Sequence, residues 1–519
     1  MRHCFSSLLR LWTFSYEKIL GGVGCLAPFR SPSSRLRRCA WISDAMSETR
    51  GKSLVEPLLS PLSADEKRAM QAAAELSLEF RASLEMMPAR PDLRPDDLLP
   101  RFATPLPETG ESAEAVIRRL AADAVPGLHA HAAPRFFGYV CGGSMPVGTA
   151  ADFLVSAWGQ NSASAKESPS VAVIEQTLCR WCLELLNLPP DCGVGVVTGG
   201  TVANAQAIIA ARDALLARQG WDVGEQGLFQ APDIPVLVGS DAHSAPIAGL
   251  RYAGFGQQRA QRVETDAEGR ICLDALDRAV KTCVSPPLVI LQAGQINTGA
   301  FDPFAQAISM VHAAGGWVHV DGAFGLWLHA VPELRHRLAG VDAADSWAVD
   351  LHKWLNAPYD AGLCIVRDRA DLVRAMTARG AYLPELEETW EPSDSTLELS
   401  RRARGVPSYA IIRHLGADGV REMVARHCAL AEYLARQLDG IAGLNVVNTV
   451  VSNQVAIACD GDDETTRVLR HVQANGKVYP SHGVWRGQQI IRVSIINFAT
   501  DRADIDLLVQ ELVDALNAR

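Results

Sequence analysis

The sequence predicts an α/β protein whose core is a largely parallel β-sheet covered by helices. Between residues 194 and 366, short apolar runs with the length of buried strands occur at 194–197, 234–239, 288–292, 316–320, 346–349 and 362–366. Stretches with helical periodicity, at 203–218, 273–283 and 303–313, separate several of these runs. Strands that alternate with helices form parallel sheets with both faces covered, which explains why these runs are almost entirely apolar.

The composition is that of an ordinary globular protein, and it limits the classes of partner. The chain has 519 residues, of which 48% are hydrophobic and 21% charged, and its net charge is −10. An acidic chain without long basic blocks is a poor match for nucleic acid or for an anionic membrane. No apolar run approaches the roughly 20 residues of a membrane-spanning helix. We therefore expect a soluble, cytoplasmic protein that acts on a small molecule.

The twelve cysteines are scattered from Cys4 to Cys459 without a repeating spacing. This usage is typical of reduced cytosolic thiols rather than of a disulfide framework. Cys179 and Cys182 are spaced like a metal or redox pair, but they lie in a stretch with helical periodicity and have no matching second pair. His129 and His131 lack a third ligand nearby, so we expect no metal site.

Residues 1–45 differ in composition from the rest of the chain. They are rich in serine and carry seven arginines and lysines against only Glu17 and Asp44. Such a segment resembles a transit peptide. We prefer the interpretation that it is an unstructured extension or translated upstream sequence, with Met46 starting the protein proper.

A chain that begins at Met46 is therefore expected to fold and to keep full activity, because no motif lies upstream. Thermal unfolding and activity of the two chain lengths, measured side by side, test this. Loss of folding on truncation would show that residues 1–45 are structural.

The folded part is expected to begin with a helical arm. Apolar residues recur at helical spacing from about residue 63 to 87, and a proline-rich connection follows at 88–107. Arms of this kind often embrace a partner subunit. A compact aromatic segment follows at 131–140, where core packing is the ordinary role of such side chains.

Chemically suggestive residues lie where the predicted strands end. The segment Thr198-Gly199-Gly200-Thr201 leads from a strand into a helix, which leaves backbone N–H groups and a hydroxyl free to hold a phosphate. His243 follows the next strand and offers an imidazole. Taken singly, glycines at a helix start and a lone histidine are weak signals with ordinary structural explanations.

Two more strand ends carry charged groups. Asp321 ends an apolar strand, where a carboxylate needs a cation or hydrogen-bond donors. Lys353 follows an apolar run and lies between His352 and Trp354. Burial favours a neutral lysine amine, which is then free for Schiff-base chemistry. By itself, such a lysine also fits a side chain that reaches solvent from a strand end.

In this order along the chain, the four groups match the needs of pyridoxal 5′-phosphate (PLP). The aldehyde of this cofactor needs an amine, and its phosphate needs N–H donors. Its pyridine nitrogen needs a carboxylate to stay protonated, so that the ring can accept electrons. If these four groups had no common role, each would have to occur at the appropriate strand end by chance.

The sequence resembles the group II PLP-dependent decarboxylases, the family of aromatic-L-amino-acid, histidine, tyrosine and glutamate decarboxylases. The motif His352-Lys353-Trp354, preceded by the His-Val-Asp-x-Ala of residues 319–323, carries the resemblance, which extends from about Ser63 to the C-terminus. It implies an enzyme that converts an L-amino acid to its amine and CO2.

The resemblance also implies roles for single residues. Lys353 would hold the cofactor covalently, Asp321 would pair with the pyridine nitrogen, and His243 would stack on the ring. The remaining cofactor contacts implied are the phosphate ligands Gly199, Gly200, Thr201 and His352, the small Ala323 beneath the ring, and Asn297 near it.

Two further matches concern the reaction and its substrate. Tyr382 resembles a mobile-loop tyrosine that returns a proton to the substrate carbon after CO2 leaves. Arg492 resembles an arginine near the substrate carboxylate, although a strand-edge ion pair explains it equally well.

The residues matching the side-chain pocket leave the substrate open. Tyr139 and Cys141 match positions that line this pocket, but Cys141 and Gly142 depart from the proline and threonine usual in aromatic amino-acid decarboxylases. Our first expectation is an aromatic L-amino acid, and our second an acidic or short aliphatic one.

The family fold is the PLP-dependent transferase fold type I. For this chain it implies an N-terminal arm at 46–145, a large PLP-binding domain with a mixed, mostly parallel sheet at 146–413, and a small α/β domain at 414–519. Family members are homodimers with interfacial active sites, so Tyr382 would serve a site at that interface.

Two alternatives remain open at this point. One is another PLP enzyme, a decarboxylating aldehyde synthase or an aminotransferase; the other is a non-catalytic PLP-binding protein. Trp354 and Tyr382 favour decarboxylation. Intact Lys353, Asp321 and His243 favour catalysis.

Overall fold

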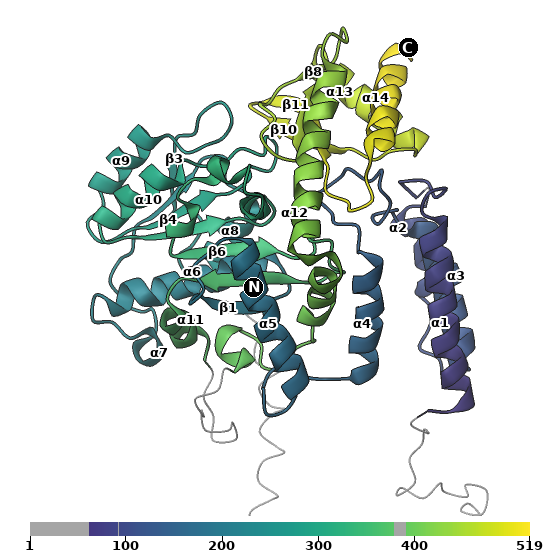
Figure 1. The fold of residues 1–519 in the computed structure, drawn as a ribbon, viewed down its shortest axis with the longest axis horizontal. Coiled ribbons are helices and arrows are strands. Elements are labelled where there is room, and N and C mark those ends of the chain that lie inside the picture. The colour runs from purple at the N-terminus through teal and green to yellow at the C-terminus, as the bar shows by residue number, and fades with distance from the viewer. Residues whose placement is uncertain (1–61, 92, 378–390, 519) are drawn as a thin grey trace, which may run out of the picture. The chain divides into compact units, whose positions relative to one another are not determined.

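The structure is a computed structural model that describes residues 62–91, 93–377 and 391–518. The larger of its two sheets has seven strands (Figure 1). The strand order is β1-β7-β6-β5-β4-β2-β3. The strands are β1 (Gly193–Val197), β2 (Val236–Gly239), β3 (Gln261–Val263), β4 (Leu288–Gln292), β5 (Trp317–Asp321), β6 (Ser346–Asp350) and β7 (Gly362–Val366). By its contacts the chain divides after Ala64, and both sheets lie in the unit Asp65–Arg519.

The direction of the strands brings several strand ends to one edge of the sheet. β7 is antiparallel to both of its neighbours, β1 and β6, and the remaining pairs are parallel. β1 therefore runs in the same direction as β6. The carboxyl ends of β1, β2, β4, β5 and β6 lie along the same edge, which is where ligands bind in sheets of this kind.

Both faces of this sheet are buried. In β4, Val289 and Leu291 pack into one apolar cluster, whereas Leu288 and Ile290 pack into another. Alternate residues of a strand point to opposite faces, so each face needs its own cover. The helix α6 (Gly200–Ala217), for example, packs against β5, β6 and β7. The predicted α/β class is confirmed.

The α-helices besides α6 are α1 (Ala64–Ser83), α2 (Pro95–Phe102), α3 (Ala113–Ala124), α4 (Pro146–Trp158), α5 (Pro169–Leu185), α7 (Val223–Gln226), α8 (Ser244–Tyr252), α9 (Leu273–Lys281), α10 (Phe304–Ala313), α11 (Arg369–Met376), α12 (Gly405–Leu438), α13 (Asp462–Asn475) and α14 (Arg502–Asn517). The helices predicted at 63–87, 203–218, 273–283 and 303–313 correspond to α1, α6, α9 and α10, whereas α2 lies in the segment expected to be a proline-rich connection. The short strand β3 was not predicted, because two of its three residues are exposed and it has no apolar run.

A second, antiparallel sheet lies in the C-terminal part, with the order β10-β11-β9-β8. Its strands are β8 (Asn445–Val446), β9 (Gln454–Ala458), β10 (Ser481–Trp485) and β11 (Gln488–Ser494). Leucines of α12, α13 and α14 complete its apolar core. Figure 1 shows α12 passing from the side of the large sheet to this smaller one.

The helix α12 contributes to both cores. Ile411 belongs to a core cluster of the large sheet and Leu434 to that of the small sheet. Its backbone leaves helical geometry at Gly416, where φ is 66° and ψ is 176°, a conformation that glycine adopts without steric cost. The proposed boundary between residues 413 and 414 falls inside this helix.

Cys179 and Cys182 lie on α5 and are buried in the core cluster of the large sheet. Burial raises the pKa of both thiols, that of Cys182 to about 12. Both therefore stay protonated and act as small apolar side chains. Among the helices in the described part of the chain, none is both long enough and apolar enough to cross a membrane.

Candidate active site

A cavity of about 330 Å³ lies at the edge where the parallel strands end. Many of the residues predicted for the cofactor site line it: Gly199, Gly200, Thr201, His243, Ala323, His352 and Lys353. Thr198, Val202, Ala245, Asp350, Tyr359 and Asp360 complete the lining. Asp321, Asn297, Tyr139, Cys141 and Arg492 do not line this cavity, and Tyr382 lies outside the described residues.

Lys353 follows β6 in a turn that is anchored on both sides. Trp354 is fully buried, and its indole Nε1 donates to His427 Nδ1 at 3.0 Å. The Lys353 side chain, 18% exposed, places Nζ 3.1 Å from Oδ2 of Asp350. The strand end and the buried tryptophan thus hold the lysine backbone while the amine reaches the cavity.

Gly142 permits the close approach of another segment to this turn. A Cβ atom at residue 142 would lie 2.3 Å from the Lys353 carbonyl oxygen and 2.4 Å from that of His352. Such contacts are impossible without a backbone shift. The departure from threonine at this position therefore has a steric reason in this chain.

Asp350, the last residue of β6, is a site residue that the sequence interpretation missed. Its Oδ1 accepts the Gly200 N–H at 2.5 Å and lies 3.4 Å from His352 Nε2, while Oδ2 faces Lys353. Its side chain is 3% exposed. A carboxylate that ends an apolar strand must find such partners. The same signal identified Asp321 and could have identified Asp350.

The glycines at the start of α6 form a narrow cradle. A Cβ at Gly199 would lie 2.7 Å from Cε1 of His352, and one at Gly200 would lie 2.9 Å from Oδ2 of Asp350. Side chains would fill this space. The Gly200 N–H already donates to Asp350, whereas Thr201 and Val202, whose N–H groups have no acceptor within the helix, line the cavity and suit an anion.

The two histidines of the cavity have defined hydrogen bonds. Nδ1 of His243 accepts the Ala245 N–H at 3.2 Å and caps α8. Nδ1 of His352 accepts the Ala361 N–H at 3.2 Å. Burial lowers the pKa of both imidazoles, an effect that Asp321 opposes at His243 and Asp350 at His352. Each ring is therefore neutral at neutral pH, with its remaining proton on Nε2.

Asp321 lies at the end of β5, 6% exposed, and its Oδ1 accepts the Ala323 N–H at 3.3 Å. Together with Lys353 and Asp350 it influences the pKa of His243, so these groups lie within electrostatic range of one another. His319, in the same motif, is instead structural. It is fully buried between Ser346 and Asn204, and burial lowers its pKa to about 3.

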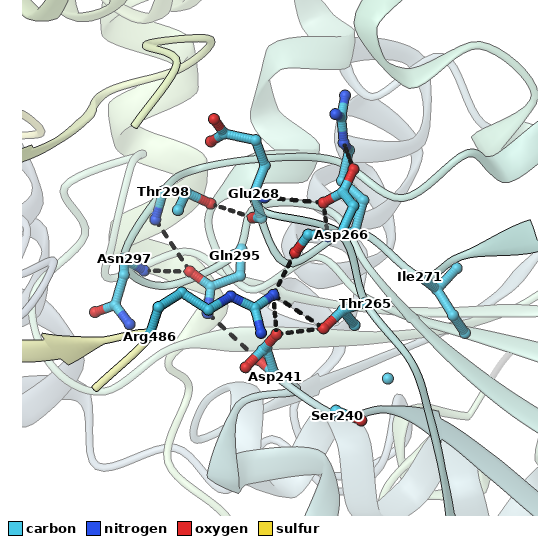
Figure 2. A network of polar contacts seen from close by, with 12 residues as sticks. Ser240, Asp241, Thr265, Asp266, Glu268, Ile271, Gln295, Asn297, Thr298 and Arg486 are labelled. Atoms are coloured by element: carbon cyan, nitrogen blue, oxygen red, sulfur yellow. Dashed lines mark hydrogen bonds and ion pairs between the residues drawn. The ribbon is translucent and has the colours of Figure 1, made fainter. Parts of the chain in front are cut away.

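Asn297 is directed toward the small sheet. Its N–H donates to Oε1 of Gln295 at 2.6 Å (Figure 2). Its Nδ2 donates to the Val484 carbonyl oxygen at 3.3 Å. Its carboxamide thus contacts the hairpin between β10 and β11.

Arg492, on β11, is partly buried near the aromatic segment. Burial lowers its pKa, and Tyr139 and Cys141 oppose this shift. Its Nε has no hydrogen-bond partner, and within the described residues the guanidinium makes no ion pair. Within the described residues Arg492 therefore does not form the strand-edge ion pair that was the alternative explanation. A guanidinium whose Nε is enclosed without an acceptor suits a site where a ligand supplies an anion.

Asn356 is a second residue that the sequence interpretation missed. It is fully buried; its Oδ1 accepts the N–H groups of Gly143 and Phe498 at 2.5 and 3.1 Å, and its Nδ2 donates to the Ile496 carbonyl oxygen at 3.0 Å. It thus joins the Lys353 turn to two distant segments. Its φ of 58° favours asparagine, but nothing in the surrounding sequence indicates that conformation.

Comparisons with known proteins agree with this geometry. The model of the family described as "Pyridoxal-dependent decarboxylase conserved domain" matches residues 95–458. The chain belongs to this family. Its cofactor is pyridoxal 5′-phosphate, and its reaction class is the decarboxylation of an amino acid.

Individual relatives of this decarboxylase match over most of their length. Tryptophan decarboxylase 1 of Oryza sativa subsp. japonica is 26% identical in an alignment of 472 positions that covers 84% of this chain and 90% of the relative. The 4-hydroxyphenylacetaldehyde synthase of Rhodiola rosea is 26% identical, over 84% of this chain and 93% of the relative. The crystal structure of Oryza sativa TDC with PLP and tryptamine superposes with a TM-score of 0.81, at 23% identity, over 88% of this chain and 99% of the other. This superposition confirms the predicted fold type.

The residues at the cavity fit this cofactor. The helix start offers N–H groups in a cradle that only glycine leaves open, and Lys353 offers an amine. Asp321, outside the cavity lining, offers a buried carboxylate at the end of β5. Asp350 adds a negative charge next to the cradle. The Lys353 ammonium at 3.1 Å compensates it.

Proposed function

We propose that this decarboxylase converts an aromatic L-amino acid to the corresponding amine and CO2. The observation that carries the proposal is the partly buried Arg492, whose Nε is enclosed without an acceptor, beside a group of aromatic rings. Phe136 stacks on Tyr479 with 4.9 Å between ring centroids, and the Tyr139 hydroxyl lies 3.3 Å from that of Tyr479. The names of the relatives, among them a tryptophan and a tyrosine decarboxylase, agree with an aromatic substrate.

Each of these groups has a proposed task with the substrate. The guanidinium of Arg492 would bind a carboxylate, because this cation has no partner within the described chain. Tyr139 and Cys141 would contact the substrate side chain, with the rings of Phe136 and Tyr479 as an apolar wall. Stacking between aromatic rings favours a flat substrate side chain.

The proposed tasks toward the cofactor follow from the same arrangement. When bound, the cofactor supplies a ring that withdraws electrons from the substrate carbon as CO2 leaves. Nζ of Lys353 would bind it covalently, the carboxylate of Asp321 would keep a proton on the pyridine nitrogen, and His243 would stack on the ring. The phosphate would be bound by Gly199, Gly200, Thr201 and His352, with Ala323 beneath the ring and Asn297 at its margin.

We also propose that two copies form a homodimer whose active sites lie at the interface. Supporting this, α2 and α3 have no buried residues, and Met70, Leu78 and Met86 are exposed in and just after α1. Several large apolar side chains exposed along one segment are consistent with a surface that another chain covers. Sedimentation velocity of the purified protein tests the assembly.

The substrate assignment is tested with a panel of aromatic, acidic and short aliphatic L-amino acids, by following CO2, amine, aldehyde and ammonia together. Amine in equal amount to CO2, with aromatic substrates preferred, supports the proposal. Preference for an acidic substrate would assign Arg492 to a side-chain carboxylate. Keto acid would indicate transamination, and a protein that binds cofactor without turnover would be a non-catalytic relative.

An aldehyde synthase is the second candidate, because one 26%-identical relative carries that name. Aldehyde, ammonia and hydrogen peroxide form when dioxygen takes two electrons before a proton returns to the substrate carbon, and water then releases the aldehyde. Tyr382, outside the described residues, is our proposed proton donor. A phenol suits this task because its pKa of about 10 keeps it protonated at neutral pH.

Tyr382→Phe is therefore expected to keep cofactor binding and CO2 release while most of the product shifts from amine to aldehyde. Oxygen consumption and product analysis measure the shift. Tyr252→Phe, at a tyrosine that is 57% exposed on α8, serves as the matched control and should leave the product unchanged. Amine formation at the wild-type rate by the Tyr382 variant would exclude this role.

A further inference from the structure

Arg486 occupies an unusual backbone position at the tip of the β10–β11 hairpin. It forms the turn together with Gly487, and φ is 51° at Arg486 and 81° at Gly487. Two-residue hairpin turns with positive φ at both positions favour asparagine, aspartate or glycine at the first one. The positive φ disfavours arginine at this position, so the contacts of its side chain are the feature that accounts for its presence.

The Arg486 side chain reaches from the hairpin to the large sheet. Its Nη2 lies 2.8 Å from Oδ2 of Asp241, donates to Oγ1 of Thr265 at 3.2 Å, and also donates to the Asp266 carbonyl oxygen (Figure 2). Its guanidinium carbon lies 4.8 Å from the centre of the Trp485 ring. Thr265 in turn donates its hydroxyl to Asp241. One guanidinium therefore contacts three residues across the gap between the two sheets.

Asp241 places this contact beside the cavity. It lies two residues before His243, in the turn that leads from β2 to α8. Its carbonyl oxygen accepts Nε2 of Gln295 at 3.3 Å, and Oε1 of Gln295 accepts the N–H groups of Asn297 and Thr298. The segments that carry His243 and Asn297 are thus bound to one another and, through Arg486, to the hairpin.

We propose that Arg486 is a positioning residue that holds the Asp241 turn, and with it His243, over the bound cofactor and so slows cofactor release. The proposal rests on the role of His243 given above. The ion pair is half-exposed, with 43% of the Arg486 and 23% of the Asp241 side chain accessible. Such a pair contributes little to global stability and is weakened by salt. Its effect is therefore expected in the local geometry of the cofactor rather than in unfolding.

The variant Arg486→Gly separates an effect on the cofactor's local geometry from an effect on the stability of the fold. Glycine suits the positive φ, so the backbone change by itself predicts an unchanged or higher unfolding temperature and an unchanged cofactor. The positioning role predicts the same unfolding temperature of the cofactor-free protein but a weaker visible circular dichroism of the bound cofactor. It also predicts about three- to fivefold faster release into a cofactor scavenger, the size that one half-exposed ion pair supplies.

Two further variants complete the test. Arg486→Lys keeps a positive charge and is expected to restore part of the slow release. Arg374→Ala removes an ion pair of similar exposure, to Asp371 at 2.6 Å on α11, and is expected to leave release and dichroism unchanged. Added salt should speed release from the wild type more than from Arg486→Gly.

Wild-type release and dichroism in Arg486→Gly would overturn the proposal. So would faster release that accompanies an equal loss of stability in the cofactor-free protein, because that pattern assigns Arg486 a structural role. These measurements use no substrate. Failure here therefore leaves the substrate panel as an independent test of the proposed function.

Discussion

Lys353→Ala is expected to abolish covalent cofactor binding and to reduce decarboxylation by roughly a thousandfold or more, since a covalent catalytic group is lost. Alanine has no amine, and no other residue lining the cavity is a lysine. The change also removes the cation 3.1 Å from Asp350. Leaving a buried carboxylate without its partner typically costs about 3 to 5 kcal/mol, so some loss of stability is expected as well.

Lys353→Arg separates these two consequences. It keeps a positive charge that Asp350 is able to bind but cannot act as the amine, so stability should largely return while activity stays lost. In the wild type, borohydride reduction and peptide mapping should place the pyridoxyl group on Lys353. A label on another lysine would refute the assignment.

Asp321→Asn is the second change with a large expected effect, and it should weaken cofactor retention as well as turnover. An amide cannot hold a proton on the pyridine nitrogen, because it carries no negative charge. Removing one member of a buried charge pair typically costs about 3 to 5 kcal/mol. The variant should therefore lose activity by roughly two to three orders of magnitude.

Asp302→Asn provides the matched control for Asp321. Asp302 is also buried, but it accepts the N–H groups of Ile271 and Gln292, both at 2.7 Å, and burial raises its pKa to about 7. Its replacement should lower thermal stability while the absorbance spectrum and affinity of the cofactor stay unchanged. Equilibrium dialysis with the cofactor and the spectrum of each variant measure the difference. Activity of Asp321→Asn within twofold of wild type would contradict the proposed pairing.

The sheet and the strand-end groups were predictable because their signals are local. A strand buried on both faces needs an apolar run, and its first polar residue lies where the run ends. This places Gly199, His243, Asp321 and Lys353 at strand ends, and the structure brings them to one edge. Strand direction, and hence the common edge, follows from alternation with helices.

Contacts between distant segments were decided only in the tertiary structure. Gly142 against the Lys353 backbone, Asn356 between three segments, and Arg486 on Asp241 each join parts of the chain that are far apart in sequence. Nothing local marks such pairs, because a glycine, an asparagine and an arginine each have many ordinary roles.

The sequence by itself thus determined the chemistry of this protein, and the tertiary structure determined its geometry. Charged residues at the ends of buried strands indicate which groups could contact a cofactor, because burying a charged side chain without a partner is costly. Which atoms pair depends on packing. Asp350 contacts Gly200 and Lys353 because β6 ends opposite the start of α6, and Asn297 contacts the hairpin because the two sheets meet there.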